Sequence, residues 1–398
     1  MTNKSQDLSR WVEKRLPIVS SFRREYVDFA MPKNLNYLWN FGAFATVSLG
    51  MLLLSGIFLA LNYTPTVSDA FSSIETMDRQ VASGWLVRSI HMGGVSMLFA
   101  ALYVHVARGL YYGSYKAPRE LIWLTGLGLL LMVMITAFAG YILPWGQMSY
   151  WGATVVVNAL NTVPLIGKAL TSWLMGGEGL GNVALHRIYV LHFLTAFSII
   201  GVFALHIATL HVAGSNNPTG IDPASSDETV PFHPYYTSKD GLGLCLFLIV
   251  YAVVVFFAPD FLTLAENYVQ ANPLVTPQDI TPEWYFAPFY AILRAVPSKL
   301  GGLILATGSI GVLFAVPWLD KSPVRSAQSR PLLRPALLIL FFSFVVLGFA
   351  GMHPPAGGWL WLSRVAVFYW YLYFLILLPL QSRGETASSL GFAKEGRE

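Results

Sequence analysis

The chain contains eight apolar segments of about twenty residues each, and this length is the feature that most limits how it can fold. A helix rises about 1.5 Å per residue, so about 20 apolar residues cross the hydrocarbon core of a bilayer. We therefore predict an all-α, polytopic membrane protein with eight transmembrane helices. The segments lie near residues 40–62, 85–112, 121–143, 183–212, 241–259, 301–319, 335–352 and 360–380.

Composition excludes several other classes of protein. Hydrophobic residues make up 55% of the 398 residues and charged residues 12%, which is not the mixture of a soluble or a disordered chain. The single cysteine, Cys245, rules out disulfides, cysteine-ligated zinc, iron–sulfur clusters and covalently attached c-type haem within this chain. A net charge of +4 does not indicate a nucleic-acid partner, because the basic residues are distributed by membrane side.

The distribution of Lys and Arg predicts the orientation. Seventeen of the 25 fall on the side of the N-terminus and five on the opposite side, so we expect the N-terminus in the cytoplasm. We divide the chain into a polar surface segment (1–39), a first four-helix bundle (40–212) and a second (213–398). The apolar connections 144–182 and 260–300 are expected to lie along the membrane surface.

Four histidines are arranged in two pairs with the same spacing. His91 and His105 lie in the second span and His192 and His206 in the fourth, fourteen residues apart in both cases. Fourteen residues return to within ~40° of the same helix face and rise ~21 Å. Both spans run in the same direction, so His91 falls level with His192 near one membrane face, and His105 level with His206 near the other.

Intramembrane histidines could also bind zinc or copper, relay protons, or form hydrogen bonds between helices. For a single histidine, the last interpretation would be as good as a functional one. Four at matched spacing and depth favour two bis-histidine haem sites, because paired imidazoles without a cysteine suit low-spin haem iron. The first bundle is then a dihaem four-helix bundle.

Glycines and arginines recur at the same two levels. The glycines would let a flat macrocycle approach the backbone closely, although any one of them is also typical of ordinary helix packing. The arginines lie one turn outward of a histidine, where they could pair with haem propionates or extend to the membrane surface. These residues are Gly42, Gly56, Gly126, Gly140, Arg88 and Arg108.

The histidine pairs, together with residues 39–42, 140–148, 214–220, 231–236 and 282–285, resemble cytochrome b of the respiratory cytochrome bc1 complex. The resemblance covers nearly the whole chain. It implies two non-covalent b-type haems, the lower-potential one on His91 and His192 and the higher-potential one on His105 and His206. It also implies that ubiquinol is oxidised on one side of the membrane and ubiquinone reduced on the other.

The resemblance extends to site residues and partners. Quinol oxidation is assigned to Glu283, with Tyr141 and Tyr290 lining the site, and quinone reduction to His211, Lys239 and Asp240. A Rieske iron–sulfur protein and cytochrome c1 are implied as partners, together with a homodimer of the complex, membrane lipid and no nucleic acid. The polar N-terminal extension favours a bacterial inner membrane over a mitochondrial one.

The residues themselves allow more than one interpretation of these sites. Glu283 could accept a quinol proton, but Thr281 and Pro282 before it resemble a helix start, where it would be a cap or surface carboxylate. His211 lies too far round its helix from His206 to share a haem, and could protonate a quinone or simply be hydrated. The other three histidines, His186, His233 and His353, are expected to be structural.

Two other functions would use similar residues. A dihaem anchor of a dehydrogenase usually has four or five spans and would leave the second bundle unexplained. A secondary transporter could use intramembrane His and Arg as a proton relay, but it would have inverted repeats and broken helices, which the sequence lacks. We therefore predict a redox enzyme subunit that depends on partner subunits, since it has no cysteines for a cluster.

Overall fold

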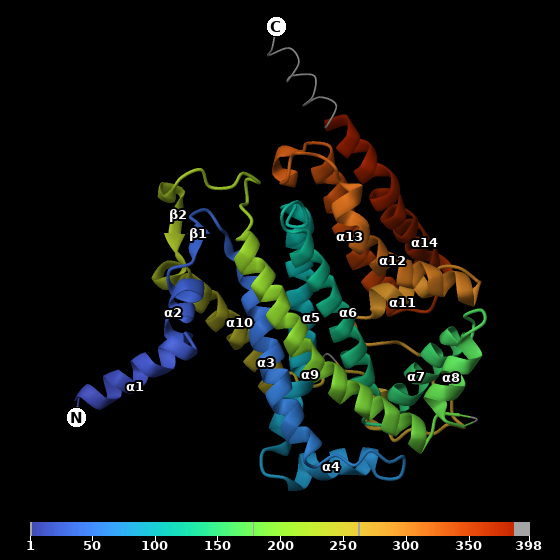
Figure 1. Ribbon diagram of the computed structural model, residues 1–398. Coiled ribbons are helices and arrows are strands. Elements are labelled where there is room, and N and C mark those ends of the chain that lie inside the picture. The colour runs from blue at the N-terminus through green and yellow to red at the C-terminus, as the bar shows by residue number, and fades with distance from the viewer. Residues whose placement is uncertain (1, 178, 262, 386–398) are drawn as a thin grey trace.

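The computed structural model describes residues 2–177, 179–261 and 263–385, and helices make up most of them (Figure 1). Eight helices in these ranges are long and apolar enough to cross a membrane, which confirms the predicted number of spans. They are Tyr37–Ala60, Gly84–Tyr111, Glu120–Ile142, Asn182–Ala213, Phe232–Phe257, Lys299–Leu319, Leu333–Gly351 and Gly357–Glu385. The predicted bounds agree to within a few residues at most ends, but the fifth span begins earlier than expected because a helical turn precedes α10.

The spans contain the α-helices α3 (Phe41–Ala60), α5 (Gly84–Tyr111), α6 (Glu120–Ile142), α9 (Asn182–Ala213), α10 (Thr237–Phe257), α12 (Lys299–Leu319), α13 (Leu333–Gly351) and α14 (Gly357–Leu372). The shorter helices are α1 (Thr2–Arg15), α2 (Ile18–Phe22), α4 (Ala70–Gln80), α7 (Gln147–Leu160), α8 (Gly167–Met175) and α11 (Ala287–Arg294). Single turns are η1 (Arg23–Val27), η2 (Tyr37–Asn40), η3 (Ser226–Glu228), η4 (Phe232–Tyr236), η5 (Ala265–Tyr268), η6 (Ala327–Ser329) and η7 (Tyr373–Leu377).

One small sheet was not predicted. Strands β1 (Ala30–Pro32) and β2 (Thr229–Pro231) pair antiparallel, with Met31 opposite Val230. The sheet joins the segment before α3 to the segment before α10, and it lies at the opposite end of the bundle from α4 (Figure 1). We refer to these two ends as the β-strand end and the α4 end.

The first four spans form the bundle that positions the histidines. Helix α3 packs along α5, and α6 packs along α9. Helix α10, which we assigned to the second bundle, contacts α5 and α3, whereas α11, α13 and α14 pack on one another. The two long connections are partly helical: α7 and α8 lie in the first, and η5 and α11 in the second.

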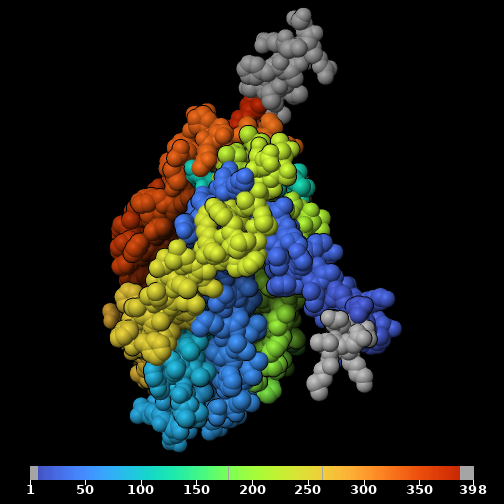
Figure 2. Space-filling model, turned by 90° about the vertical axis from the view of Figure 1, so that its left-hand side faces the viewer, coloured from blue at the N-terminus to red at the C-terminus, as the bar shows by residue number. Residues whose placement is uncertain are grey.

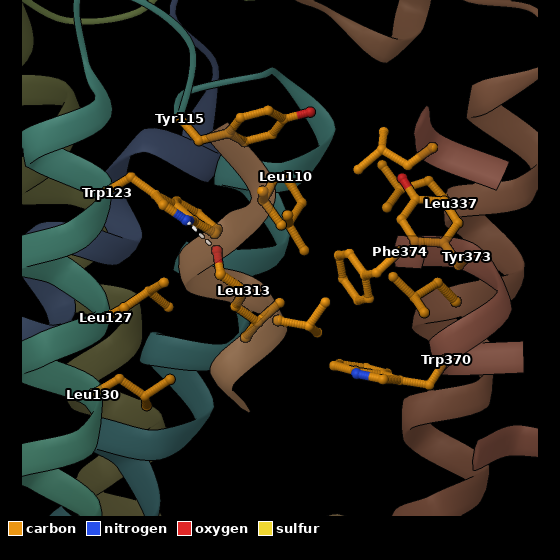
Figure 3. Close-up of a cluster of buried hydrophobic side chains, with 14 of the residues drawn as sticks. Leu110, Tyr115, Trp123, Leu127, Leu130, Leu313, Leu337, Trp370, Tyr373 and Phe374 are labelled. Carbon is orange, nitrogen blue, oxygen red and sulfur yellow. Dashed lines mark hydrogen bonds between the residues drawn. The ribbon is translucent and has the colours of Figure 1, made fainter. Parts of the chain in front are cut away.

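A buried apolar cluster joins α6 to α12, α13 and α14. Trp123, Leu127 and Leu130 project from α6 toward Leu313 on α12, with Trp370 on α14 beyond it (Figure 3). The indole Nε1–H of Trp123 donates a hydrogen bond of 2.8 Å to the carbonyl of Leu313, so this buried polar group is satisfied inside the interface. Burial of these large side chains holds the last three spans against the first bundle.

A buried ionic cluster supports the same junction near the β-strand end. The side chain of Asp320 is fully buried and lies 2.9 Å from Lys116 Nζ and 2.7 Å from Arg330 Nη1, while the Tyr115 hydroxyl donates to it at 2.5 Å. Burial acts to raise the pKa of Asp320, but the charges of Lys116 and Arg330 outweigh it, so that this pKa lies below its usual value. Asp320 is therefore ionised at neutral pH and links the α5–α6 connection to the end of α12.

We expect Asp320→Asn to destabilise the protein by about 3 kcal/mol, because Lys116 and Arg330 would be left buried with too little negative charge. The effect should be largest at neutral pH and shrink in acid, where Asp320 itself becomes protonated. Thermal unfolding in detergent measures it, with the exposed Asp227→Asn as the matched control. Equal melting temperatures for the two variants would show that the ionic cluster does not hold the junction.

Candidate functional site

The structure brings His91 and His192 opposite each other across the interior of the first bundle. Their ring centroids are 6.3 Å apart and their planes are inclined by 69°. A metal–nitrogen bond is about 2.0 Å long and a ring centroid lies about 1.1 Å beyond the nitrogen, so two imidazoles on one metal have centroids roughly 6 Å apart. The observed separation therefore fits one metal ion between the two rings.

Hydroxyl or carbonyl oxygens on the facing helices form hydrogen bonds with three of the four histidine rings and fix their orientation. The Nδ1 atoms lie 2.9 Å from Ser55 Oγ in His91, 3.0 Å from Thr125 Oγ1 in His206 and 2.8 Å from the Thr136 carbonyl in His192. When an oxygen accepts a hydrogen bond from Nδ1–H, the ring proton stays on Nδ1 and the Nε2 lone pair is free. This is the tautomer that binds a metal through Nε2. We did not predict Ser55, Thr125 and Thr136 from the sequence. A Ser or Thr at the same depth as a predicted histidine ligand could have indicated them.

The fourth histidine, His105, differs. Its Nδ1 lies 3.2 Å from Arg108 Nη2 on the next turn of α5, and it is near enough to His206 to interact with it electrostatically. The structure thus places His105 and His206 as neighbours nearer the β-strand end, as the fourteen-residue spacing predicts.

Each of the four glycines lies against one histidine ring. A Cβ atom would lie 3.1 Å from the Cε1 atom of the facing ring at Gly42, Gly56 and Gly126, and 2.6 Å at Gly140. The rings concerned are, in the same order, His105, His91, His206 and His192. We had expected these glycines to admit the edge of a macrocycle; the structure gives a more direct reason, which is that they make room for the imidazoles.

A cavity adjoins the His91–His192 pair at the α4 end. Its volume is about 250 Å³, slightly below the 300–1,000 Å³ typical of a single ligand site. Its walls include the residues expected at this level and the candidate residues for quinol chemistry: Gly56, Arg88, His91, Gly140, Tyr141, His192 and Glu283. One continuous space therefore reaches from the histidine pair to the Glu283 carboxyl.

The two arginines have different surroundings. Arg88 forms an ion pair with Asp78 of α4 and lies 5.5 Å from the ring of Tyr268. Arg108 donates to Ser114 Oγ at 3.3 Å, and its buried Nε has no hydrogen-bond partner in the structure. A buried guanidinium with an unsatisfied N–H fits an anionic group such as a haem propionate.

Residues 283–286 are held against α5 by their side chains and backbone. The ring of Tyr285 stacks on Phe99 with centroids 4.3 Å apart, and Trp284 Nε1–H donates to Ser96 Oγ at 3.0 Å. Helix α11 begins only at Ala287, with Phe286 at its N-cap position. Glu283 is therefore neither a helix cap nor a surface group, and the alternative that its sequence neighbours suggested is wrong.

Glu283 is almost completely buried, with 7% of its surface exposed. Burial raises the pKa of its carboxyl to about 8, because the charged form is poorly solvated there. The buried Tyr141 hydroxyl, which also lines the cavity, has no hydrogen-bond partner in the structure. Tyr290 is not among the residues that line the cavity; its hydroxyl donates to the Ile280 carbonyl at 2.8 Å and so fixes the loop before Glu283.

At the β-strand end, the N-terminal segment contacts α9 and α10. These helices carry the other three candidate residues, His211, Lys239 and Asp240. His211 Nδ1 lies 3.2 Å from Glu25 Oε2, and the rings of Tyr26 and Phe29 pack on the imidazole. Lys239 donates to the Leu35 carbonyl from the first turn of α10, which also carries Asp240. Glu25, Tyr26 and Phe29 were missed in the sequence, because nothing in the pattern of residues 1–39 links them to the end of α9.

The remaining histidines have no metal-ligand geometry. His186 is exposed near Tyr189, His233 lies 3.3 Å from the Thr237 hydroxyl, and His353 stacks on Trp359 at 4.1 Å. Across the described ranges, no group of three or more His, Cys, Asp or Glu side chains is placed to hold a metal ion. Protein zinc sites need three or four such ligands, whereas a haem iron needs only the two axial ones, so the donor set fits haem.

Fold and site together define a polytopic, all-α membrane protein with two histidine pairs inside its first four-helix bundle. A family model described as cytochrome b/b6/petB matches residues 26–214, and one described as cytochrome b (C-terminal)/b6/petD matches residues 270–372. The chain belongs to the cytochrome b family.

Individual relatives match over nearly the full length. Cytochrome b of Rickettsia bellii (strain RML369-C) is 50% identical over 384 residues, 96% of either chain. Cytochrome b of Rhodospirillum rubrum is 48% identical over 93% of this chain and 92% of the relative. A solved structure titled "Hyperthermophilic respiratory Complex III" is similar with a TM-score of 0.88 and 32% identity, covering 94% of this chain and 99% of that chain. The predicted resemblance and fold class are confirmed.

Substitution of Gly140 by Ala should weaken or abolish haem binding at the α4 end, because the added Cβ would lie 2.6 Å from the His192 ring. The matched control is Gly128→Ala in the same helix, where nothing lies within 4 Å of the added atom. The haem content per chain and the reduced-minus-oxidised spectrum of the two purified variants measure the effect. Full haem content in both variants would contradict the assignment of Gly140 to the site.

Proposed function

We propose that this chain is the dihaem cytochrome b of a quinol:cytochrome c oxidoreductase, in which it carries electrons across the membrane between two quinone sites. The observation that carries the proposal is the His91–His192 pair, with a ring separation of 6.3 Å that suits one iron and with Nδ1 of each ring held by an oxygen. The matching level of His105 and His206 supports a second haem ~21 Å along the same two helices.

The two haems, when bound, would each accept and donate one electron without an open coordination position. The chain's own residues would hold them: the four histidines as iron ligands, the four glycines as space for the imidazole rings, and Arg108 as a partner for a propionate. Arg88 could serve the other haem, in competition with Asp78. The apolar interior excludes water and so lowers the cost of reorganisation for each electron step.

Oxidation of ubiquinol is proposed in the cavity at the α4 end. A quinol gives up two protons with its two electrons, and Glu283 is the carboxyl that faces this space. With a pKa of about 8, it can take a proton from the quinol and still release it to water. The hydroxyl of Tyr141 is free to donate a hydrogen bond to a quinol oxygen. Tyr290 acts indirectly, by fixing the loop before Glu283.

Reduction of ubiquinone is proposed at the β-strand end, between His211, Lys239 and Asp240. The His211 ring lies near the end of α9, beyond His206, and could give a proton to a quinone oxygen. Lys239 supplies positive charge on the neighbouring helix. One electron from each quinol would reach this site through both haems, and the proton release at one face and uptake at the other would contribute to a proton-motive force.

Partner subunits are part of this proposal. The chain has one cysteine, so the electron that does not cross the membrane must leave through another protein. A Rieske iron–sulfur protein and cytochrome c1 suit that role, and a relative from Bradyrhizobium diazoefficiens is named cytochrome b/c1, with 55% of its length covered by this chain. We place the protein in a bacterial inner membrane as part of a dimeric complex, with its N-terminus and β-strand end in the cytoplasm.

Replacement of one ligand from each pair should remove one haem at a time. We expect His192→Ala and His206→Ala each to retain about one b haem where the wild-type protein holds two, with different absorption maxima lost in the two variants. His186→Ala, in the same helix but exposed, is the control and should retain both. Loss of both haems in the control, or of none in the ligand variants, would contradict the assignment.

The rate of quinol oxidation should rise with pH through about 8, because Glu283 must be ionised to accept a proton. In Glu283→Gln we expect a rate lower by about 100-fold and no inflection near this pH. The exposed Glu266→Gln in the same connection is the control. Steady-state quinol:cytochrome c activity of the assembled complex measures both, and an unchanged pH profile in Glu283→Gln would exclude Glu283 as the acceptor.

A further inference from the structure

The N-terminal segment places a carboxylate on the histidine of the proposed quinone-reduction site. Glu25 lies in η1, and its Oε2 is 3.2 Å from His211 Nδ1, whereas its Oε1 is 2.6 Å from Arg24 Nε. The Glu25 side chain is 28% exposed and that of His211 18%, while that of Arg24 is 72% exposed. Glu25 and His211 thus form a half-buried contact, whereas Arg24 on the other carboxylate oxygen extends into solvent.

Aromatic side chains from the same segment hold the imidazole in place. The ring of Phe29 lies 4.8 Å from the His211 ring, and Tyr26 meets it edge-on at 5.5 Å. The three residues therefore close around His211 from one side. With Nδ1 directed at Glu25, the other nitrogen, Nε2, faces away from the carboxylate.

The segment itself is anchored on the C-terminal side of Glu25. Strand β1 pairs with β2, the Tyr236 hydroxyl donates to the Pro32 carbonyl at 2.5 Å, and Lys239 donates to the Leu35 carbonyl. Figure 2 shows the blue N-terminal segment lying against the yellow-green residues that join α9 to α10. The position of Glu25 is thus set by contacts with the elements that carry the other candidate residues.

We propose that Glu25 is a positioning residue for quinone reduction, which orients His211 and stabilises its imidazolium through the Nδ1–H···carboxylate hydrogen bond. This proposal rests on the proposed function of His211. It is a role for a residue of the N-terminal segment that the pattern of the sequence does not indicate.

The proton balance of the step is simple. Reduction of one quinone to a quinol takes two electrons, which arrive through the haem chain, and two protons. The imidazolium gives its Nε2 proton to the nearer quinone oxygen and becomes a neutral imidazole, whose Nδ1–H still donates to the Glu25 carboxylate. The other quinone oxygen lies on the opposite side of the quinone ring and takes its proton from water. Water at the membrane surface then returns a proton to Nε2. As the acceptor of the Nδ1–H, the Glu25 carboxylate holds the imidazole so that Nε2 is the nitrogen that donates.

Other charged or titratable groups lie on the elements packed around this contact. They are Arg23, Arg24 and Asp28 on the N-terminal segment, His233 on η4, and Lys239 and Asp240 on the first turn of α10. Arg23 pairs with Asp28 at 3.0 Å, and neither has a recorded contact with His211. Asp28→Asn is therefore a matched control, since it removes one carboxylate from the same segment without touching the imidazole.

The test uses the assembled complex with its haems reduced in advance. A short-chain ubiquinone is mixed in at several concentrations, and the oxidation of the reduced b haem is followed. In Glu25→Gln we expect the rate at saturating quinone to fall about ten-fold, while the quinone concentration that gives half-maximal rate stays close to that of the wild type. Asp28→Asn should keep the wild-type rate, and Glu25→Asp, which retains the carboxylate, should recover most of the loss. Unchanged haem spectra in all variants establish that they are folded.

Each outcome decides between the proposals. A Glu25→Gln rate equal to that of the wild type would overturn the role of Glu25, and so would a loss of rate that Glu25→Asp does not recover, because that result indicates structural disturbance alone. His211→Gln separates the two levels of the argument. If it slows the reaction while Glu25→Gln does not, only the role of Glu25 fails; if His211→Gln also leaves the rate unchanged, the proposed quinone-reduction site fails.

Discussion

Close approach between helix backbones and imidazole rings is the contact on which the first bundle depends. At each histidine, a glycine on the facing helix leaves the space into which the ring fits, and a Cβ there would be 2.6 to 3.1 Å from it. A bilayer offers no water to satisfy the ring nitrogens, so Ser55, Thr125 and the Thr136 carbonyl do so from within. These contacts hold α3 against α5, and α6 against α9, at two depths in the membrane.

The rest of the molecule positions chemistry around this bundle. The second half of the chain packs on α6 through Trp123 and its neighbours and is tied to the α5–α6 connection by Asp320. That junction in turn supports the loop that carries Glu283, whose Trp284 and Tyr285 rest on α5. Burial at this junction is what raises the pKa of Glu283, so the packing of the two halves and the proposed acid–base chemistry have one physical origin.

Much of this could be predicted from sequence because membrane spans obey simple rules. Apolar length determines the number of spans, and helical periodicity brings His91, His105, His192 and His206 to two levels. The glycines were found at the correct levels, but the reason for them was not, since spacing cannot show which side chain faces a backbone. Contacts between distant segments could not be predicted from the sequence either. They are the β1–β2 pairing, the packing of α10 on α3 and α5, and the contact of Glu25 with His211. Glu283 shows the same limit, because Thr281 and Pro282 predict a helix start that the tertiary structure places five residues later.

The central claim is that two bis-histidine haems lie one above the other in the first bundle. An optical redox titration of the purified wild-type protein, combined with determination of the haem type and the number of haems per chain, tests it most directly. The account predicts two non-covalent b-type haems that titrate as two separate one-electron steps, since the two levels differ in their surroundings: His105 lies beside Arg108, and His91 lines the cavity that also contains Glu283. A folded protein that binds no haem, or only one, would contradict it.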